Sequence, residues 1–253
     1  WLESGDTVLA MDLSHGGHLT HGAPVTRSAK QYNFVRYKVK DVDTGEIDYE
    51  QLRSLALEHQ PKIILAGFSS YSRELDYEKF AEIRNEVGAL LVADLAHIAG
   101  LIAGCVAKNP LDYGFHVLTT TTHKTLRGPR GGMILSKGAV SNPLKAPEKT
   151  IENIPTLIDR AVFPGIQGGP QMHSIAAKAV ALYEASQPEF KKYAQSILDN
   201  STALANALLE RGFKLISGGT SNHMMVINIM ESYGFDGRKF QRVLESVGIP
   251  LNS

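Results

Sequence analysis

The chain has 253 residues, of which 43% are hydrophobic and 21% charged, which suits one large α/β domain and part of a second. Lysine plus arginine and aspartate plus glutamate each number 26, so no basic surplus points to nucleic acid or to a membrane surface. The single cysteine, Cys105, excludes an internal disulfide, fits a reducing compartment and is expected to be a small buried hydrophobe. No apolar run approaches a membrane span and no leader pattern is visible, so we expect a cytoplasmic protein whose partners are small molecules and copies of itself.

The two ends of the sequence have an unusual pattern. Residues 1–6 have the pattern of a helix tail followed by a glycine stop, with no helix before it. Residues 248–253 end where a new strand is expected to begin. We therefore expect the chain to be an internal segment of a longer protein.

Apolar runs alternate with amphipathic helices in the first half of the chain. The runs are too short for helices and continuous enough for strands buried on both faces of a parallel sheet. Asp48 is expected to cap a helix that runs to His59, with Gln51 three positions on as in a capping box, and a helix over 76–87 ends at Gly88. Strands are expected at 7–11, 62–67, 89–94, 116–120 and 132–136. The predicted fold class is α/β, a mostly parallel sheet covered by helices on both faces, with the start of a smaller α+β domain.

The last third of the chain predicts this smaller unit. Helices are expected at 170–185 and 188–211, followed by paired strands at 213–217 and 224–230 and by an amphipathic helix around residues 240–247. Ser186-Gln187-Pro188 interrupts the helical pattern. We therefore divide the chain into a large domain, residues 1–186, with its N-terminal part missing, and the truncated beginning of a small domain, residues 187–253.

Asp94 ends one of the apolar strands. In open α/β sheets ligands bind beyond the carboxyl ends of the strands, so this carboxylate is expected in a site region. There it could pair with the protonated pyridine nitrogen of pyridoxal phosphate and keep that ring an electron sink. The alternative is a helix N-cap, where Asp is a favoured residue. The residue alone leaves both interpretations open.

Lys124 follows four threonines and precedes a glycine-rich turn in the run TTTTHKTLRGPRGG, residues 119–132. A lysine becomes a nucleophile toward a carbonyl when burial or a neighbouring cation lowers its pKa, and the usual carbonyl is the aldehyde of pyridoxal phosphate. The alternative is a solvated surface lysine, which is the ordinary state of this residue type.

His15, His18 and His21 are spaced by three in the run LSHGGHLTHG. On a helix this spacing would suggest a metal site. Gly16-Gly17 disfavours a helix, however, and no cysteine supports zinc, so we predict no metal site.

Two loop segments also have simpler interpretations. Ser69 and Ser72 could close local turns with their hydroxyl groups. Gly168 and Gly169 could lead into a helix that starts with Pro170 as its first residue. From these residues alone, neither segment is assigned to a site.

Taken together, these runs resemble the serine hydroxymethyltransferase family, fold-type I pyridoxal-phosphate enzymes of the aspartate aminotransferase kind, along nearly all of the chain. The strongest marker is TTTTHK, residues 119–124. The other blocks occur in the family's order: LSHGGHLTHG (13–22), GFSSYS (67–72), VADLAHIAG (92–100), FPGIQGGP (163–170) and SGGTSNH (217–223).

The resemblance implies roles around the cofactor, pyridoxal 5'-phosphate. Lys124 is expected to form the Schiff base, Asp94 to hold the pyridine nitrogen, and the imidazole of His18 to stack on the ring. Ser69 and His97 are expected on the side of the ring that carries the phenolic oxygen.

The resemblance also implies residues nearer to the reaction and to the substrates. Thr121 is expected near the Schiff base, His123 is linked to substrate choice, and Arg130 lies in the adjoining turn. The expected catalytic set is thus Lys124, His123, Thr121 and Asp94. Leu13, Gly17, His18 and Leu19 are expected on the folate side, while Phe163, Gly168 and Gly169 reach across a dimer interface.

The implied reaction is the interconversion of serine and glycine with transfer of the one-carbon unit to tetrahydrofolate, by a homodimer or a dimer of dimers. The family's phosphate-binding loop, its proton-handling glutamate and tyrosine, and its carboxylate-binding arginine are expected outside this segment. Two alternatives stay open: a folate-independent aldolase with the same cofactor, such as a threonine aldolase, and a catalytically silent fragment.

Overall fold

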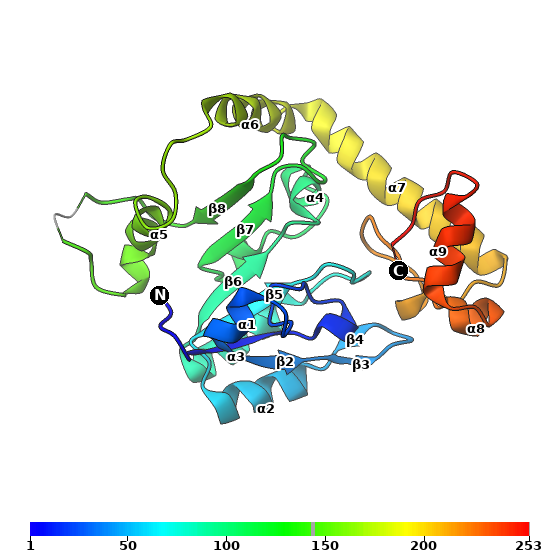
Figure 1. The fold of residues 1–253 in the computed structure, drawn as a ribbon, viewed down its shortest axis with the longest axis horizontal. Helices are drawn as coiled ribbons and strands as arrows, with labels where there is room; N and C mark the ends of the chain where they lie inside the picture. Colours follow the sequence, from blue (N-terminus) through cyan, green and yellow to red (C-terminus); the bar gives the residue numbers. More distant parts are fainter. Residues whose placement is uncertain (143–144, 253) are drawn as a thin grey trace.

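A six-stranded sheet with the order β2-β1-β5-β6-β7-β8 forms the centre of the protein (Figure 1). The computed structural model describes residues 1–142 and 145–252. The strands of the sheet are β1 (Thr7–Met11), β2 (Asn33–Tyr37), β5 (Ile63–Gly67), β6 (Leu90–Asp94), β7 (Val117–Thr121) and β8 (Gly132–Ser136). Two short strands, β3 (Val39–Asp41) and β4 (Glu46–Ile47), pair separately as an antiparallel hairpin.

Neighbouring strands of the large sheet run parallel, except that β8 is antiparallel to β7. The exception has a local cause. The connection over 122–131 is shorter than the dozen or so residues that a parallel crossover needs, so the chain turns back beside β7. Because the other connections cross over, the carboxyl ends of β1, β5, β6 and β7 meet at one edge of the sheet.

Helices follow most of the strands. The α-helices are α1 (Arg27–Gln31), α2 (Tyr49–His59), α3 (Tyr77–Val87), α4 (Ala99–Ala103), α5 (Ile154–Val162), α6 (Met172–Ala185), α7 (Pro188–Glu210), α8 (Ile229–Tyr233) and α9 (Gly237–Glu245). Short 3-10 helices lie at Leu13–His15, Pro110–Tyr113, Ile151–Asn153 and Ile216–Gly218.

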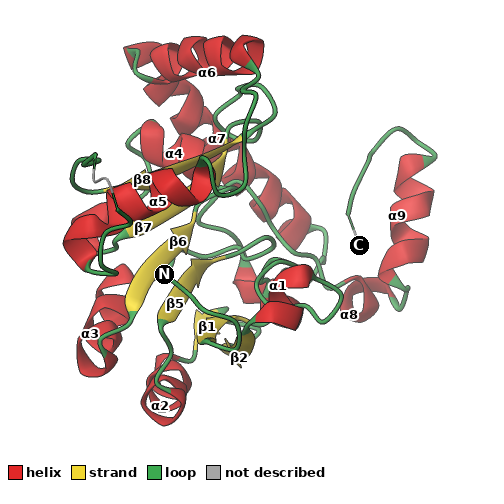
Figure 2. Ribbon diagram, turned by 60° about the vertical axis from the view of Figure 1, so that its left-hand side comes forward, coloured by secondary structure: helices red, strands yellow, loops and turns green. Residues whose placement is uncertain are grey.

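Helices lie on both sides of the central sheet (Figure 2). Alternate residues of a strand point to opposite faces of a sheet, so each side receives every second residue. On one face Leu91 and Leu118 belong to the main core, which α2, α3, α4 and the first turns of α7 complete. On the other face Leu90 and Val117 pack with Ile154 of α5. Burial on both faces is why these strands are continuous apolar runs, and it confirms the predicted fold class.

The predicted helix start at Asp48 is confirmed, but the start predicted at Pro170 is wrong, because α6 begins at Met172 with Gln171 as its N-cap. One detail of the Asp48 cap is also wrong. Asp48 Oδ1 accepts from the Gln51 amide at 2.9 Å, and Asp76 caps α3 in the same way. The Gln51 side chain, however, accepts from the Lys38 amide at 3.1 Å instead of returning to Asp48. The amide of Asp48 donates to the Lys38 carbonyl, so it needs no capping-box partner.

The strand pair predicted at 213–217 and 224–230 is reduced to a single bridge between Leu215 and Ile227. Ser217 has a φ of 63°, and the backbone turns into a 3-10 helix there, which ends the pairing. At the other end Asn228 caps α8 by accepting from the Glu231 amide at 3.1 Å. The helix at the end of the chain is present as α9.

Several elements have no counterpart in the sequence prediction: the strand β2, the β3–β4 hairpin and the helices α1, α4, α5 and α8. In addition, Cys105 is exposed, so its expected burial is wrong. It follows the end of α4 and has a φ of 57°.

Two further expectations concern the chain as a whole. Within 1–142 and 145–252, none of the helices combines the length and apolar character needed to cross a membrane. The division at residue 187 stays a prediction, although Phe190 and Ala194 of α7 belong to the main core. A new strand was expected to begin at the end of residues 248–253, and within this segment Ser253 lies outside the described residues.

Candidate functional site

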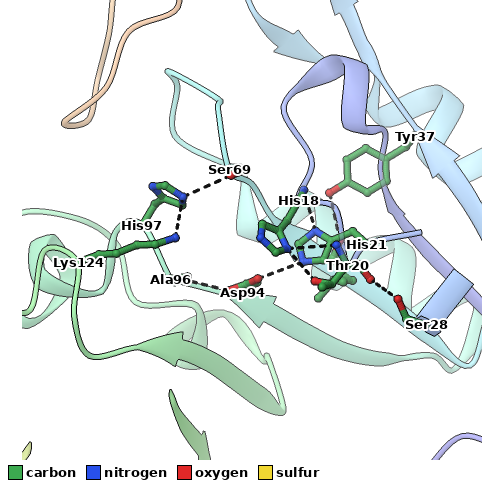
Figure 3. A network of polar contacts seen from close by, with 11 residues as sticks. His18, Thr20, His21, Ser28, Tyr37, Ser69, Asp94, Ala96, His97 and Lys124 are labelled. Atoms are coloured by element: carbon green, nitrogen blue, oxygen red, sulfur yellow. Dashed lines mark hydrogen bonds and ion pairs between the residues drawn. The ribbon is translucent and has the colours of Figure 1, made fainter. Parts of the chain in front are cut away.

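The loops that follow β1, β5, β6 and β7 bring most of the predicted site residues together at the carboxyl edge of the sheet (Figure 3). Ligand sites of open α/β sheets lie at this edge. Two polar groups meet there. One contains Lys124, His97 and Ser69, and the other contains Asp94, His21 and His18.

Lys124 contacts His97. Its Nζ lies 2.9 Å from Nε2 of His97, and this His97 nitrogen also lies 3.5 Å from Oγ of Ser69. Burial lowers the pKa of Lys124, while the charge of Asp94 acts in the opposite direction. Burial, with Lys124 and His223 as further causes, lowers the pKa of His97 to about 4. A neutral imidazole therefore faces an amine that loses its proton more readily than a solvated lysine.

Asp94 is held from two sides. Oδ1 accepts from the Ala96 amide at 3.1 Å, and Oδ2 lies 3.1 Å from Nε2 of His21. Burial favours the neutral acid most strongly, yet the hydrogen bond and charge of His21 and the Ala96 amide together lower the pKa of Asp94. The side chain is 18% exposed, so a carboxylate with a partly open face remains at the site.

The structure decides between the two interpretations of Asp94 as far as capping is concerned. α4 starts at Ala99, its N-cap residue is Ile98, and no side chain caps it. Asp94 instead closes a turn two residues long at the end of β6. It is therefore not the N-cap of the helix that follows.

His18 lies beside Asp94 and is joined to its own loop. Its Nδ1 is 2.8 Å from Oγ1 of Thr20, and its ring meets the ring of His21 edge-on at 5.6 Å between centroids. Burial lowers the pKa of His18, with His21 as the next cause. The ring therefore favours the neutral form.

The structure brings together a different set of residues from the three histidines that the sequence spacing groups. Ligand atoms of His18, His21 and Asp94 all lie within 4.8 Å of one another, whereas His15 is not part of this group. Two imidazoles and a carboxylate are a donor set that zinc sites also use. The prediction that no metal binds here stays a prediction.

Two glycines let the β1 loop reach the site. The Gly16 carbonyl accepts from the amides of Ser69 and Ser70, which joins the β1 loop to the β5 loop. A Cβ on Gly17 would lie 2.2 Å from the Met11 carbonyl oxygen, so only glycine fits there. The GG pair thus sets the positions of His18 and His21.

Residues near Lys124 tie its loop to the β6 loop. Thr121 Oγ1 donates to the Ala96 carbonyl at 3.3 Å, and Thr125 Oγ1 donates to the His97 carbonyl at 3.0 Å. His123 Nδ1 accepts from the Gly131 amide at 3.3 Å, so its ring supports the turn after Lys124. These bonds place Thr121 and His123 next to the lysine without assigning them a chemical role.

The residues expected on the folate side and at the dimer interface lie in two places. Leu13 and Leu19, in the β1 loop, are 45% and 50% exposed. Phe163 is 64% exposed, and Gly168 and Gly169 line an open hollow between β8, α5 and α6. Arg130 lines the same hollow. Among the described residues, Lys124 and Asp94 do not belong to the lining of this hollow.

Two histidines at the site received no role from the sequence. His21 is 5% exposed and pairs with Asp94. His223, from the SGGTSNH block, stacks on His97 with 5.8 Å between ring centroids and 16° between planes. The histidine run pointed to His21, but the 73 positions that separate it from Asp94 left the partner unidentified.

The comparison with protein families agrees with the resemblance. The family model described as "Serine hydroxymethyltransferase" matches residues 1–253, the whole length of the chain.

Proposed function

The chain belongs to the serine hydroxymethyltransferase family, and from this premise we propose that it interconverts serine and glycine and passes the one-carbon unit to tetrahydrofolate. The family is one of pyridoxal-phosphate-dependent transferases. The observation that carries the proposal is that a lysine amine, in contact with His97, and a carboxylate, in contact with His21, lie at the same edge of the sheet.

The residues present fit pyridoxal 5'-phosphate. Lys124 offers the amine that bonds to its aldehyde, and Asp94 offers a carboxylate for its ring nitrogen. His18 lies beside Asp94 with a flat, neutral ring suited to stacking, and Ser69 with His97 offers polar atoms on the lysine side. When bound, the cofactor supplies an electron-withdrawing ring that stabilises the electron pair released as the Cα–Cβ bond of serine breaks.

Asp94 would accept a hydrogen bond from the ring nitrogen of the cofactor and so favour its protonated form. A carboxylate whose own pKa is lowered keeps its negative charge at neutral pH, and this charge favours the protonated ring. Each pKa unit gained by the ring nitrogen corresponds to about 1.4 kcal/mol. His21 preserves the effect because its hydrogen bond orients the carboxylate.

Lys124 holds and releases a proton at Nζ. Its lowered pKa raises the fraction of free amine, which is the form that attacks a carbonyl. His97 stays neutral at physiological pH, so it offers a lone pair to this amine without adding a like charge. Thr121 and His123 are proposed to act next to Lys124, on the reacting part of the substrate.

We propose that the exposed residues contact the substrate and a partner copy of the chain. Leu13, Gly17, His18 and Leu19 are proposed for the folate ring system, with Gly17 buried and the other three exposed or partly exposed. Phe163, Gly168 and Gly169 are proposed to act on the site of a second copy, in a cytoplasmic homodimer or dimer of dimers. Glycine amides without side chains suit a phosphate group there.

The covalent role of Lys124 is tested by incubation with pyridoxal phosphate, borohydride reduction and peptide mass spectrometry. We expect the adduct on Lys124 and its loss in Lys124→Ala. Lys62→Ala, which removes an exposed lysine paired with Asp6, is the matched control and should keep the adduct. An adduct on another side chain, or none at all, overturns the assignment.

The reaction is tested by serine cleavage with and without tetrahydrofolate. Turnover that needs tetrahydrofolate supports the proposed activity. Cleavage of 3-hydroxy amino acids that is indifferent to folate identifies an aldolase of the same cofactor class instead. A protein that carries the adduct but turns over neither substrate is a catalytically silent fragment.

A further inference from the structure

The segment 217–224 reaches the site from the C-terminal part of the chain. Ser221 donates its amide to the Ser72 carbonyl at 2.8 Å, and Asn222 Nδ2 donates to the Tyr71 carbonyl at 2.9 Å. The Arg73 side chain donates to the carbonyl of Ser217 from the other side. These bonds fix the segment to the same β5 loop that carries Ser69.

His223 is placed on His97 by this anchoring. The two rings are almost parallel, with 16° between planes and 5.8 Å between centroids. Nδ1 of His223 is buried and has no hydrogen-bond partner among the residues that the structure describes. The contact that we identify for the His223 ring is therefore its stacking on His97, and not a hydrogen bond to Nδ1.

We propose that His223 is a positioning residue: it holds the His97 ring in the orientation from which Nε2 reaches the Lys124 amine. His97 has only two other side-chain contacts, Ser69 Oγ at 3.5 Å and Lys124 Nζ at 2.9 Å, among the polar contacts of the described residues. Both contacts are made by Nε2 of His97. They fix the position of this atom but do not stop the His97 ring from rotating about an axis that passes through it. The stacked ring of His223 supplies that restriction.

Electrostatics agree with this arrangement. The charged and titratable groups that face His97 are Lys124, His223, Asp94 and His18, and apart from Asp94 each of them disfavours a charged His97. Burial lowers the pKa of His223 too, and Lys124 adds to the effect. Two neutral rings can stack beside the lysine without repelling it. Removal of His223 exposes His97 to water and removes one of the groups that lower the pKa of His97.

The test uses two variants and a control. His223→Phe keeps a flat ring that can stack, and His223→Ala removes it. His59→Ala, at the exposed end of α2, controls for loss of a histidine elsewhere. The first readout is the pKa of His97, measured by NMR on histidine-labelled protein without cofactor. The second is the rate at which borohydride traps pyridoxal phosphate on Lys124.

We expect His223→Ala to raise the pKa of His97 from about 4 toward 6.5. Trapping on Lys124 should slow about tenfold, as expected for a reacting group displaced by a fraction of an ångström. His223→Phe should keep a trapping rate close to that of the unsubstituted chain, with a smaller rise in the pKa of His97. An unchanged His97 pKa and trapping rate in His223→Ala overturn the proposal, and so does a trapping rate in His223→Phe as low as in His223→Ala.

The trapping readout rests on the proposed function, whereas the NMR readout does not. If the unsubstituted chain carries no adduct on Lys124, the proposed function fails. The position of His97 against His223 is still tested by the titration of His97 in that case. Circular dichroism of each variant checks that the substitution has left the fold intact.

Discussion

Replacement of Asp94 by Asn should leave the fold intact and remove most of the activity. The amide has the shape of the carboxylate, and its oxygen can still accept from the Ala96 amide as Oδ1 does at 3.1 Å. What is lost is the negative charge. At hydrogen-bond distance and an effective dielectric constant of about 20, a charge pair is worth about 5 kcal/mol. At about 1.4 kcal/mol per factor of ten, we expect a loss of roughly 10³- to 10⁴-fold in kcat/KM.

The assay compares Asp94→Asn with Asp76→Asn, a substitution of the same kind at a helix cap. Asp76 Oδ1 accepts from the Lys79 amide at 3.2 Å and lies at the start of α3, away from the site. Serine cleavage, the absorption spectrum of bound pyridoxal phosphate and thermal unfolding are measured for both. The control should lose a little stability, about 1 kcal/mol or less, and no activity.

Two results refute the reasoning about Asp94. If Asp94→Asn turns over serine at the rate of the unsubstituted chain, the charge at this position has no part in the reaction. If it unfolds, Asp94 is needed for the sheet edge itself, and its pair with His21 is a structural contact. Loss of activity with an unchanged melting temperature is the outcome that the structure predicts.

Three further substitutions test other contacts. Burial lowers the pKa of His97 from 6.5 to about 4, so on acidification His97 is protonated at a higher pH in the unfolded chain than in the folded chain. The free energy of unfolding should therefore fall as the pH drops from about 6.5 to 4. His97→Asn should flatten this decline in urea unfolding measured at several pH values, and an unchanged pH dependence contradicts the burial of a neutral ring. Arg127→Ala should cost about 0.5–1 kcal/mol in urea unfolding, because the guanidinium carbon lies 4.1 Å from the centroid of the Tyr193 ring. No loss would show that this exposed contact is too mobile to matter. Asn222→Ala should cost about 1–3 kcal/mol, because the side chain is 5% exposed and donates to the Tyr71 carbonyl, and calorimetry that finds no change contradicts its anchoring role.

The fold was predictable where local chemistry decides it. Strands β5, β6 and β7 are continuous apolar runs because both faces are covered, and Asp48 and Asp76 start helices because their side chains satisfy free amides. β2 was missed because it is an edge strand with only Tyr37 buried, so its pattern is not continuous. The strand pair after α7 failed because Ser217 adopts a positive φ that its residue type does not announce.

The sequence predicted which residues lie together at the candidate site, but it did not predict which of them contact each other. The sheet edge brings Asp94 and Lys124 together because parallel strands end on the same side. The contacting residues come from loops whose paths no periodicity describes: His21 reaches Asp94 through the turn at Gly16-Gly17, and His223 reaches His97 in an anchored segment. Such contacts depend on tertiary folding, so a sequence pattern shows the histidines without their partners.

Asp94 and Lys124 are also linked through their charges, which gives the Asp94→Asn substitution a second, separable consequence. Burial lowers the pKa of Lys124, and the charge of Asp94 opposes this effect. When the charge of Asp94 is neutralised, by substitution or by a cation bound at the carboxylate, the opposition disappears and the pKa of Lys124 falls further. We therefore expect Asp94→Asn to lower the pKa of Lys124 further than burial alone does beside a charged Asp94. Burial is thus the larger influence on how readily the amine gives up its proton, and the charge of Asp94 is the smaller, opposing one.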